Sequence, residues 1–329
     1  MSERLFPARV GRRLAKVAIY VGLIIVLSLL PLFIKSPYSI HIAIMTLILI
    51  ISASSLRTIA ISGQISLAHA AFMGIGAYTA AVLSIELGWT PWITIPLGGL
   101  AAMAIAVLIG YSFSRLRAIY FAMVSLFFGL GTLAINSLFK EYTGGERGLL
   151  GIEPLFAGPY KVPYYYFFLG LTLFSLLALY RFESCRIGVT LKAIAQSYLV
   201  ASSVGINESG YRVLALAVGC FFAGLAGAGY AHYTLVLSQS SFGLLASIYV
   251  LVYVLVGGLG SFVGPIIGTA VLIVIPEFFR GLKEFAPYIF ASISIIVIFV
   301  MPQGLVGLFE RTKLWVAKLR EGKAVTHAS

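Results

Sequence analysis

Side chains that can do chemistry are scarce inside the apolar segments of this 329-residue chain, and three of them gather at one place. Gln64, Ser66 and His69 stand at the start of a long apolar run, where lipid cannot satisfy their hydrogen bonds. They could line the path of a polar solute, or they could form hydrogen bonds where two helices cross. For His69 alone, an interhelical hydrogen bond is a better interpretation than a proton relay or a metal ligand.

Several kinds of site are missing from the sequence. All eleven acidic residues are glutamate, so the chain has no aspartate to bind the magnesium of an ATPase. No P-loop motif is present, and the cysteines, Cys185 and Cys220, are too few for a metal cluster and are expected to be free thiols. The sequence therefore predicts no catalytic residue, no metal site and no cofactor in this chain.

The polar segment also carries a face of small side chains. At four-residue spacing, Ser66, Ala70, Gly74 and Tyr78 share one side of a helix, which lets a neighbouring helix approach closely. We predict helix packing at Gly74 and a candidate solute path at Gln64, Ser66, His69 and Tyr78.

A second unusual segment reads G-G-L-G-S-F-V-G-P-I-I-G over residues 257–268. Gly260, Gly264 and Gly268 form a doubled G-x-x-x-G motif, which predicts close helix packing. The alternative is a discontinuous helix interrupted at Pro265, with Gly257 and Gly258 exposing backbone groups to the solute path.

The overall composition is that of a membrane protein. Hydrophobic residues make up 60% of the chain and charged residues only 10%, with a mean hydropathy of +1.02. Soluble domains, disordered tails and nucleic-acid binders are excluded. We predict an all-α, polytopic fold of about ten membrane-spanning helices in two inverted halves with discontinuous segments. The expected spans are 17–34, 38–56, 66–87, 92–113, 118–139, 164–180, 213–237, 244–258, 263–279 and 286–301. Residues 244–279 could form two full passes or two half-helices.

The charge distribution predicts the sidedness of the chain. Ten spans place both termini on one side, and 17 of the 23 Lys and Arg residues then lie on the side predicted to be cytoplasmic. We expect a basic cytoplasmic N-terminus at 1–16, a transmembrane domain at 17–301 and a basic cytoplasmic tail at 302–329. The excess of positive charge suits anionic lipid headgroups rather than nucleic acid.

The longest polar insertion, residues 181–212, lies on the predicted cytoplasmic side. Ser197 is a plausible N-cap and Gly205 a plausible C-terminal stop, so a short helix is expected between them. Its apolar Leu199, Val200 and Val204 suit docking into the groove of a partner, although a solvated connector is the alternative.

Taken together, these segments resemble the M-type (LivM-like) permease subunits of branched-chain amino acid ABC importers. The resemblance covers about residues 38–309, and its motifs are found at 62–80, 116–126, 143–149, 223–227, 257–265 and 301–308. Two departures from the family pattern occur. Ala195 and Gln196 replace an arginine and an acid, and residues 128–133 lack the charged pair that family members commonly have.

The resemblance implies a bacterial inner-membrane importer in which this chain does no chemistry. An H-type permease would be its partner in the membrane, an external solute-binding protein would deliver the solute, and two cytosolic ATPases would bind and hydrolyse ATP with Mg²⁺. The expected ATPase-coupling residues are Gln196, Ser197, Tyr198, Leu199, Val204, Gly205 and Asn207. Branched-chain or related amino acids are the expected solute. An ion-coupled secondary transporter is the alternative, although such carriers usually hold a carboxylate inside the membrane.

Overall fold

The computed structural model describes residues 22, 26–33, 36–116, 118–158, 161–278, 286–301 and 304–307. Nine of the predicted spans coincide with helices in that part of the chain, while most of the predicted span 17–34 lies outside it. The long helices are α2 (Pro37–Ala60), α3 (His69–Leu87), α4 (Pro91–Ser114), α5 (Ala118–Leu138), α7 (Val162–Ser184), α10 (Glu208–Thr234), α11 (Leu244–Gly257), α12 (Gly264–Phe278) and α13 (Ala286–Val300).

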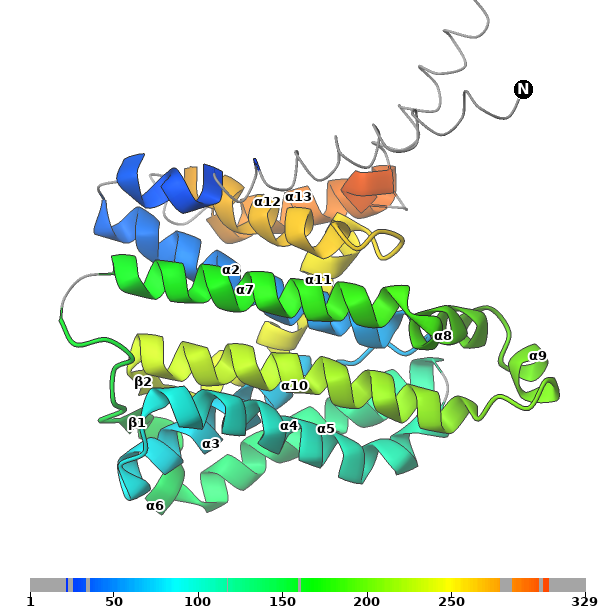
Figure 1. The fold of residues 1–329 in the computed structure, drawn as a ribbon, viewed down its shortest axis with the longest axis horizontal. Coiled ribbons are helices and arrows are strands. Elements are labelled where there is room, and N and C mark those ends of the chain that lie inside the picture. Colours follow the sequence, from blue (N-terminus) through cyan, green and yellow to red (C-terminus); the bar gives the residue numbers. More distant parts are fainter. Residues whose placement is uncertain are drawn as a thin grey trace, which may run out of the picture.

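Shorter elements connect the long helices. They are α6 (Lys140–Thr143), the 3-10 helix η1 (Gly145–Arg147), strand β1 (Leu149–Leu150), α8 (Arg186–Gln196), α9 (Tyr198–Ser203), strand β2 (Val236–Leu237) and the 3-10 helix η2 (Gln239–Phe242). The two strands pair antiparallel, with Leu149 opposite Leu237. They lie at one end of the helical bundle, and α8 and α9 protrude from the other end (Figure 1).

Local sequence explains where the helices begin and end. Prolines stand in the first turns of α2, α4 and α7, where a missing backbone N–H costs no helical hydrogen bond. Gly88 ends α3 in the left-handed conformation, with φ of 62°. The expected start of the third span at Ser66 is wrong by three residues: 66–68 are not helical, and α3 begins at His69.

Seven helices in the described residues are long and apolar enough to cross a membrane. One of the seven is Gln239–Gly257, which takes η2 and α11 together, because α11 alone has 14 residues. α12 and α13 have 15 residues each and rise about 22 Å, less than the roughly 30 Å of a hydrocarbon core. The chain is therefore an all-α, multi-pass membrane protein.

Helix α2 lies at the centre of the bundle. It packs against α7 and α10 on one side and against α11 and α12 on another, and it contributes side chains to both hydrophobic clusters of the core. α10 packs in turn against α3 and α4, whereas only 11% of the most apolar part of α5 is buried. α5 therefore presents most of its surface outward.

Glycines bring α3, α4 and α10 into close contact. A Cβ on Gly76 of α3 would overlap the backbone of Gly224 in α10, and one on Gly98 of α4 would lie 2.6 Å from the carbonyl oxygen of Gly76. A Cβ on Gly227 of α10 would overlap the carbonyl of Met73. These three helices meet backbone to backbone, so no side chain fits between them.

Candidate transport path and coupling arm

The polar groups before α3 have partners inside the protein. Gln64 is buried, and its Nε2 donates to the backbone carbonyl of Leu116 at 3.3 Å. Ser66 is also buried, and its Oγ accepts a hydrogen bond from the backbone N–H of Ala68 at 3.3 Å. The bond of Gln64 links two distant segments, whereas that of Ser66 is local; both favour a structural role.

His69 is held in the same way. Its Nε2 lies 2.9 Å from the Oγ of Ser55 and 2.9 Å from the carbonyl oxygen of Ser52, both in α2. No group of three or more His, Cys, Asp or Glu side chains that could bind a metal occurs in the described residues. Two buried polar atoms of this segment have no hydrogen-bond partner among the described residues: Nδ1 of His69 and the hydroxyl of Tyr78. The ring of Tyr78 contacts Phe242 edge to face.

A largely apolar cavity of about 160 Å³ lies next to this segment. An apolar cavity of about 150 Å³ in a protein core is large enough to bind benzene, so this one can hold a hydrocarbon group of four to six carbons. Helices α2, α3, α10 and α11 form its walls together with η2; the lining residues are Met45, Ile48, Leu49, Ala70, Met73, Tyr230, Ser241, Phe242, Ala246, Tyr249, Val250 and Tyr253. Gln64, Ser66, His69, Tyr78, Gly257 and Gly258 are not among them.

Helices α11 and α12, with the connection at 258–263, form an antiparallel glycine hairpin. A Cβ on Gly264 would overlap the carbonyl oxygen of Gly258, and one on Gly268 would overlap that of Tyr253. A Cβ on Gly257 would overlap the carbonyl of Gly264. The two helices therefore pack backbone to backbone, and Gly257 lies inside that contact.

Of the other two glycines predicted to pack closely, Gly74 does so and Gly260 does not. A Cβ on Gly74 would lie 3.0 Å from the Cβ of Phe242, which is a tight contact. Gly260 is exposed, and a Cβ there would meet no atom within 4 Å, so the close packing does not extend to Gly260. Gly258 has φ of 104°. It lies against Gly304, and a Cβ added to Gly304 would overlap the backbone of Gly258.

Helices α8 and α9 form what we call the arm, residues 186–203. Ser197 caps α9 by accepting from the backbone N–H of Val200 at 3.5 Å. At the other end, Gly205 has φ of 82°, and its N–H bonds to the carbonyl of Ser202 while that of Ile206 bonds to Ala201, the pattern of a Schellman motif.

Three apolar side chains at α9 are exposed, two on the helix and one at its C-cap residue, Val204, whereas Ala201 of α9 is buried. Leu199 and Val200 are each 64% exposed and Val204 is 70% exposed, which is a high fraction for three neighbouring apolar residues. Gln196 is exposed at the end of α8, and Tyr198 is half-buried. Asn207 is exposed and caps α10, accepting from the N–H of Gly210 at 3.2 Å.

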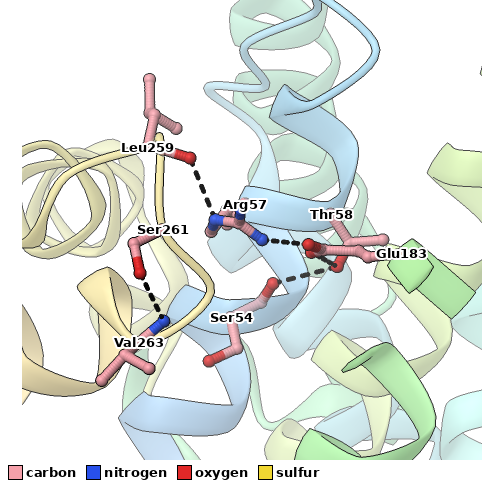
Figure 2. A network of polar contacts seen from close by, with 7 residues as sticks. All are labelled: Ser54, Arg57, Thr58, Glu183, Leu259, Ser261 and Val263. Atoms are coloured by element: carbon pink, nitrogen blue, oxygen red, sulfur yellow. Dashed lines mark hydrogen bonds and ion pairs between the residues drawn. The ribbon is translucent and has the colours of Figure 1, made fainter. Parts of the chain in front are cut away.

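Two features of this end of the molecule were missed by sequence reasoning. Residues 186–196 form a full helix, α8, whose apolar face buries Leu191 and Ile194. The second is an ion pair between Arg57 and Glu183, whose side chains are each only 4% exposed. In Figure 2, Arg57 from α2 lies between Glu183 at the end of α7 and the hairpin loop.

The hydrogen bonds around Arg57 link three parts of the chain. Its Nη1 donates to Glu183, and its Nε donates to the carbonyl oxygen of Leu259 at 3.1 Å. Thr58 donates a hydrogen bond to the other carboxylate oxygen of Glu183 at 3.1 Å. The guanidinium also lies 5.7 Å from the centre of the Phe262 ring.

Comparisons with known proteins agree on one family. A family profile described as the permease component of branched-chain amino acid transport systems matches residues 38–302. The high-affinity branched-chain amino acid transport system permease protein LivM of Salmonella typhimurium LT2 is 29% identical over 97% of this chain and 81% of its own, as is LivM of Escherichia coli K12. The permease LivH of E. coli K12 is 25% identical over 77% of this chain and 89% of its own. No solved structure gives a significant match.

Proposed function

Because the chain belongs to the permease component family of branched-chain amino acid transport systems, we propose that it forms, with a second permease, the membrane path of a branched-chain or related amino acid. The chain is a permease subunit of an ABC importer and is not itself an enzyme. Its similarity to both LivM and LivH supports a pair of permeases, in which this chain takes the M-type place.

The observation that carries the proposal is the arm. Exposed apolar side chains are unfavourable in water unless a partner covers them. Leu199 and Val200 on α9 and Val204 at its C-cap form such a surface, which suits the groove of a second protein. We assign that groove to a cytosolic ATPase subunit, which supplies the nucleotide site that this chain lacks. Two ATPases would bind ATP and Mg²⁺, and an external solute-binding protein would deliver the solute.

The cavity supports an amino acid with an aliphatic side chain as the solute. Its 160 Å³ suits a hydrocarbon group of the size of a leucine or isoleucine side chain. The importer would lie in a bacterial inner membrane, with about ten passes and with the arm and both termini in the cytoplasm. The concentration of Lys and Arg on that side supports this orientation.

The experiment is to place charges on α9 and its C-cap residue and to measure two properties of the same cells. In the double variant Leu199→Asp with Val204→Asp, docking would bury unpaired carboxylates, which costs several kcal/mol. We expect the variant to insert in the membrane, to lose ATPase recovery on an affinity-tagged chain and to lose uptake of radiolabelled leucine. The control, Ser184→Asp with Ala193→Asp, adds the same charge at exposed positions outside α9 and should retain both.

Unchanged ATPase recovery with the α9 variant would reject α9 as the docking element. Uptake that persists without bound ATPase would favour an ion-coupled secondary transporter. Loss of recovery in both variants would show that docking responds to added charge anywhere in this region and does not depend on α9 in particular.

A further inference from the structure

Arg57 contacts two parts of the protein, the end of α7 and the glycine hairpin. Among the described residues, α7 packs mainly on α2 and α8, and the glycine hairpin packs mainly on α2. Arg57 belongs to α2 and reaches both, donating to Glu183 of α7 and to the carbonyl oxygen of Leu259 in the hairpin loop. Glu183 lies one residue before the last residue of α7, three residues ahead of the arm.

Aromatic side chains also join the end of α7 to the hairpin loop. Phe262 of the hairpin loop lies 5.7 Å from the guanidinium of Arg57, and its ring contacts Tyr180 of α7 edge to face at 5.4 Å. The end of α7 is therefore linked to the loop in two ways: through Arg57, which bonds to Glu183 and to the carbonyl of Leu259, and through the direct contact of Tyr180 with Phe262, beside which the Arg57 guanidinium lies.

We propose that Arg57 is a positioning residue that transmits the position of the arm to the glycine hairpin. The inference rests on the proposed function, in which an ATPase moves the arm. A displacement at α8 would shift the end of α7 and the carboxylate of Glu183, and Arg57 would carry that shift to Leu259. Since α11 forms one wall of the apolar cavity through Ala246 and Val250, the signal ends beside the candidate solute site.

The chemistry of these groups suits transmission better than simple stabilisation. Arginine holds its donors in a rigid planar fork, so Nη1 and Nε donate to two acceptors whose relative position the guanidinium fixes. A buried ion pair contributes little net stability compared with apolar residues of the same volume. The acceptor in the loop is a backbone carbonyl, so moving Arg57 moves the path of the chain rather than one side chain.

The test uses the assembled importer with its partner permease and ATPases, reconstituted in liposomes, and measures solute transported per ATP hydrolysed. Arg57→Lys keeps a cation beside Glu183 but cannot reproduce the fork. The double variant Arg57→Met with Glu183→Met removes both charges and so leaves no unpaired buried charge to prevent folding. We expect both variants to assemble with the ATPases and to transport at least about 5-fold less solute per ATP, the low end of an allosteric coupling.

Arg181→Met is the matched control, because Arg181 is an exposed arginine in the last turn of α7. This variant should transport as much solute per ATP hydrolysed as the parent. A second measurement follows the movement directly, by the distance between spin labels at Ser202 on the arm and Gly260 in the loop, with Cys185 and Cys220 replaced. Gly260 is exposed and has open space for a label. ATP should change that distance in the parent and change it less in the double variant.

The outcomes separate the two proposals. If the parent complex contains no ATPase, the proposed function fails, and this inference fails with it. If the parent couples transport to ATP and the double variant assembles and couples equally well, only the role of Arg57 is overturned. An equal response of the spin-label distance in the two proteins would overturn that role as well.

Discussion

Gly76→Ala tests the backbone contact of α3, α4 and α10 with a single methyl group. The added Cβ would overlap the carbonyl group and Cα of Gly224, which are backbone atoms and cannot rotate away. Helices α3 and α10 would have to separate. The matched variant is Gly131→Ala in α5, where a Cβ would meet no atom within 4 Å.

The two substitutions share one effect and differ in another. Replacing glycine by alanine inside a helix stabilises it by about 0.5–1 kcal/mol, and both variants gain this. Only Gly76→Ala also incurs overpacking, which costs about 1–3 kcal/mol. We therefore expect the free energies of unfolding of the two variants to differ by about 1–3 kcal/mol, with Gly131→Ala the more stable.

The assay is thermal unfolding of the purified chain in detergent at a fixed heating rate. At about 2 °C per kcal/mol for a chain of this size, the midpoint of Gly76→Ala should lie about 2–6 °C below that of Gly131→Ala. Because membrane proteins unfold irreversibly in many detergents, only the difference at one heating rate is interpreted. Equal midpoints for the two variants would refute the backbone contact.

Three further predictions concern packing, sidedness and the cavity. Gly264→Leu should lower folded yield and transport by overpacking the hairpin, whereas Gly260→Leu, placed in open space, should be tolerated; equal yields would contradict the difference in packing. Single cysteines at Ser2 and Ser329, which lie outside the described residues, should resist an impermeant thiol reagent added from outside, and efficient labelling would disprove cytoplasmic termini. Ala246→Phe should fill the cavity and reduce leucine uptake several-fold while ATPase recovery stays unchanged; normal uptake would exclude the cavity from the path.

The helices were predictable from the sequence because a long apolar run inside a membrane must pair its backbone N–H and C=O groups internally, which an α-helix does. The limits of α11 and α12 agree with the expected spans 244–258 and 263–279 to within one residue, since glycines mark both ends of their connection. The helix between Ser197 and Gly205 was also predictable, because a cap and a stop signal are local properties.

Residues that act through distant partners were not predictable in this way. Arg57 and Glu183 are 126 positions apart, and each looks like an ordinary charge at the end of a span until the fold brings them together. Gln64 and His69 stood out in the sequence as polar residues in an apolar setting, but the sequence could not say that the carbonyl groups of Leu116 and Ser52 would lie within hydrogen-bond distance of them. The length of 181–212 indicated structure there, but the helical spacing of the apolar residues in α8 was not recognised.

The central place of α2 has a consequence for how the chain is made. Ser52, Ser55 and Thr58 of α2 are buried by later parts of the protein, and about 100 residues separate the end of α2 from the start of α7. At about 5–20 residues per second, a ribosome needs roughly 5–20 s to produce that stretch. During this interval the serine-rich side of α2 has neither α7 nor α10 to cover it. Of these later parts, α3 is made first, and its His69 contacts Ser52 and Ser55, so α3 can cover part of this side of α2 before α7 and α10 are translated.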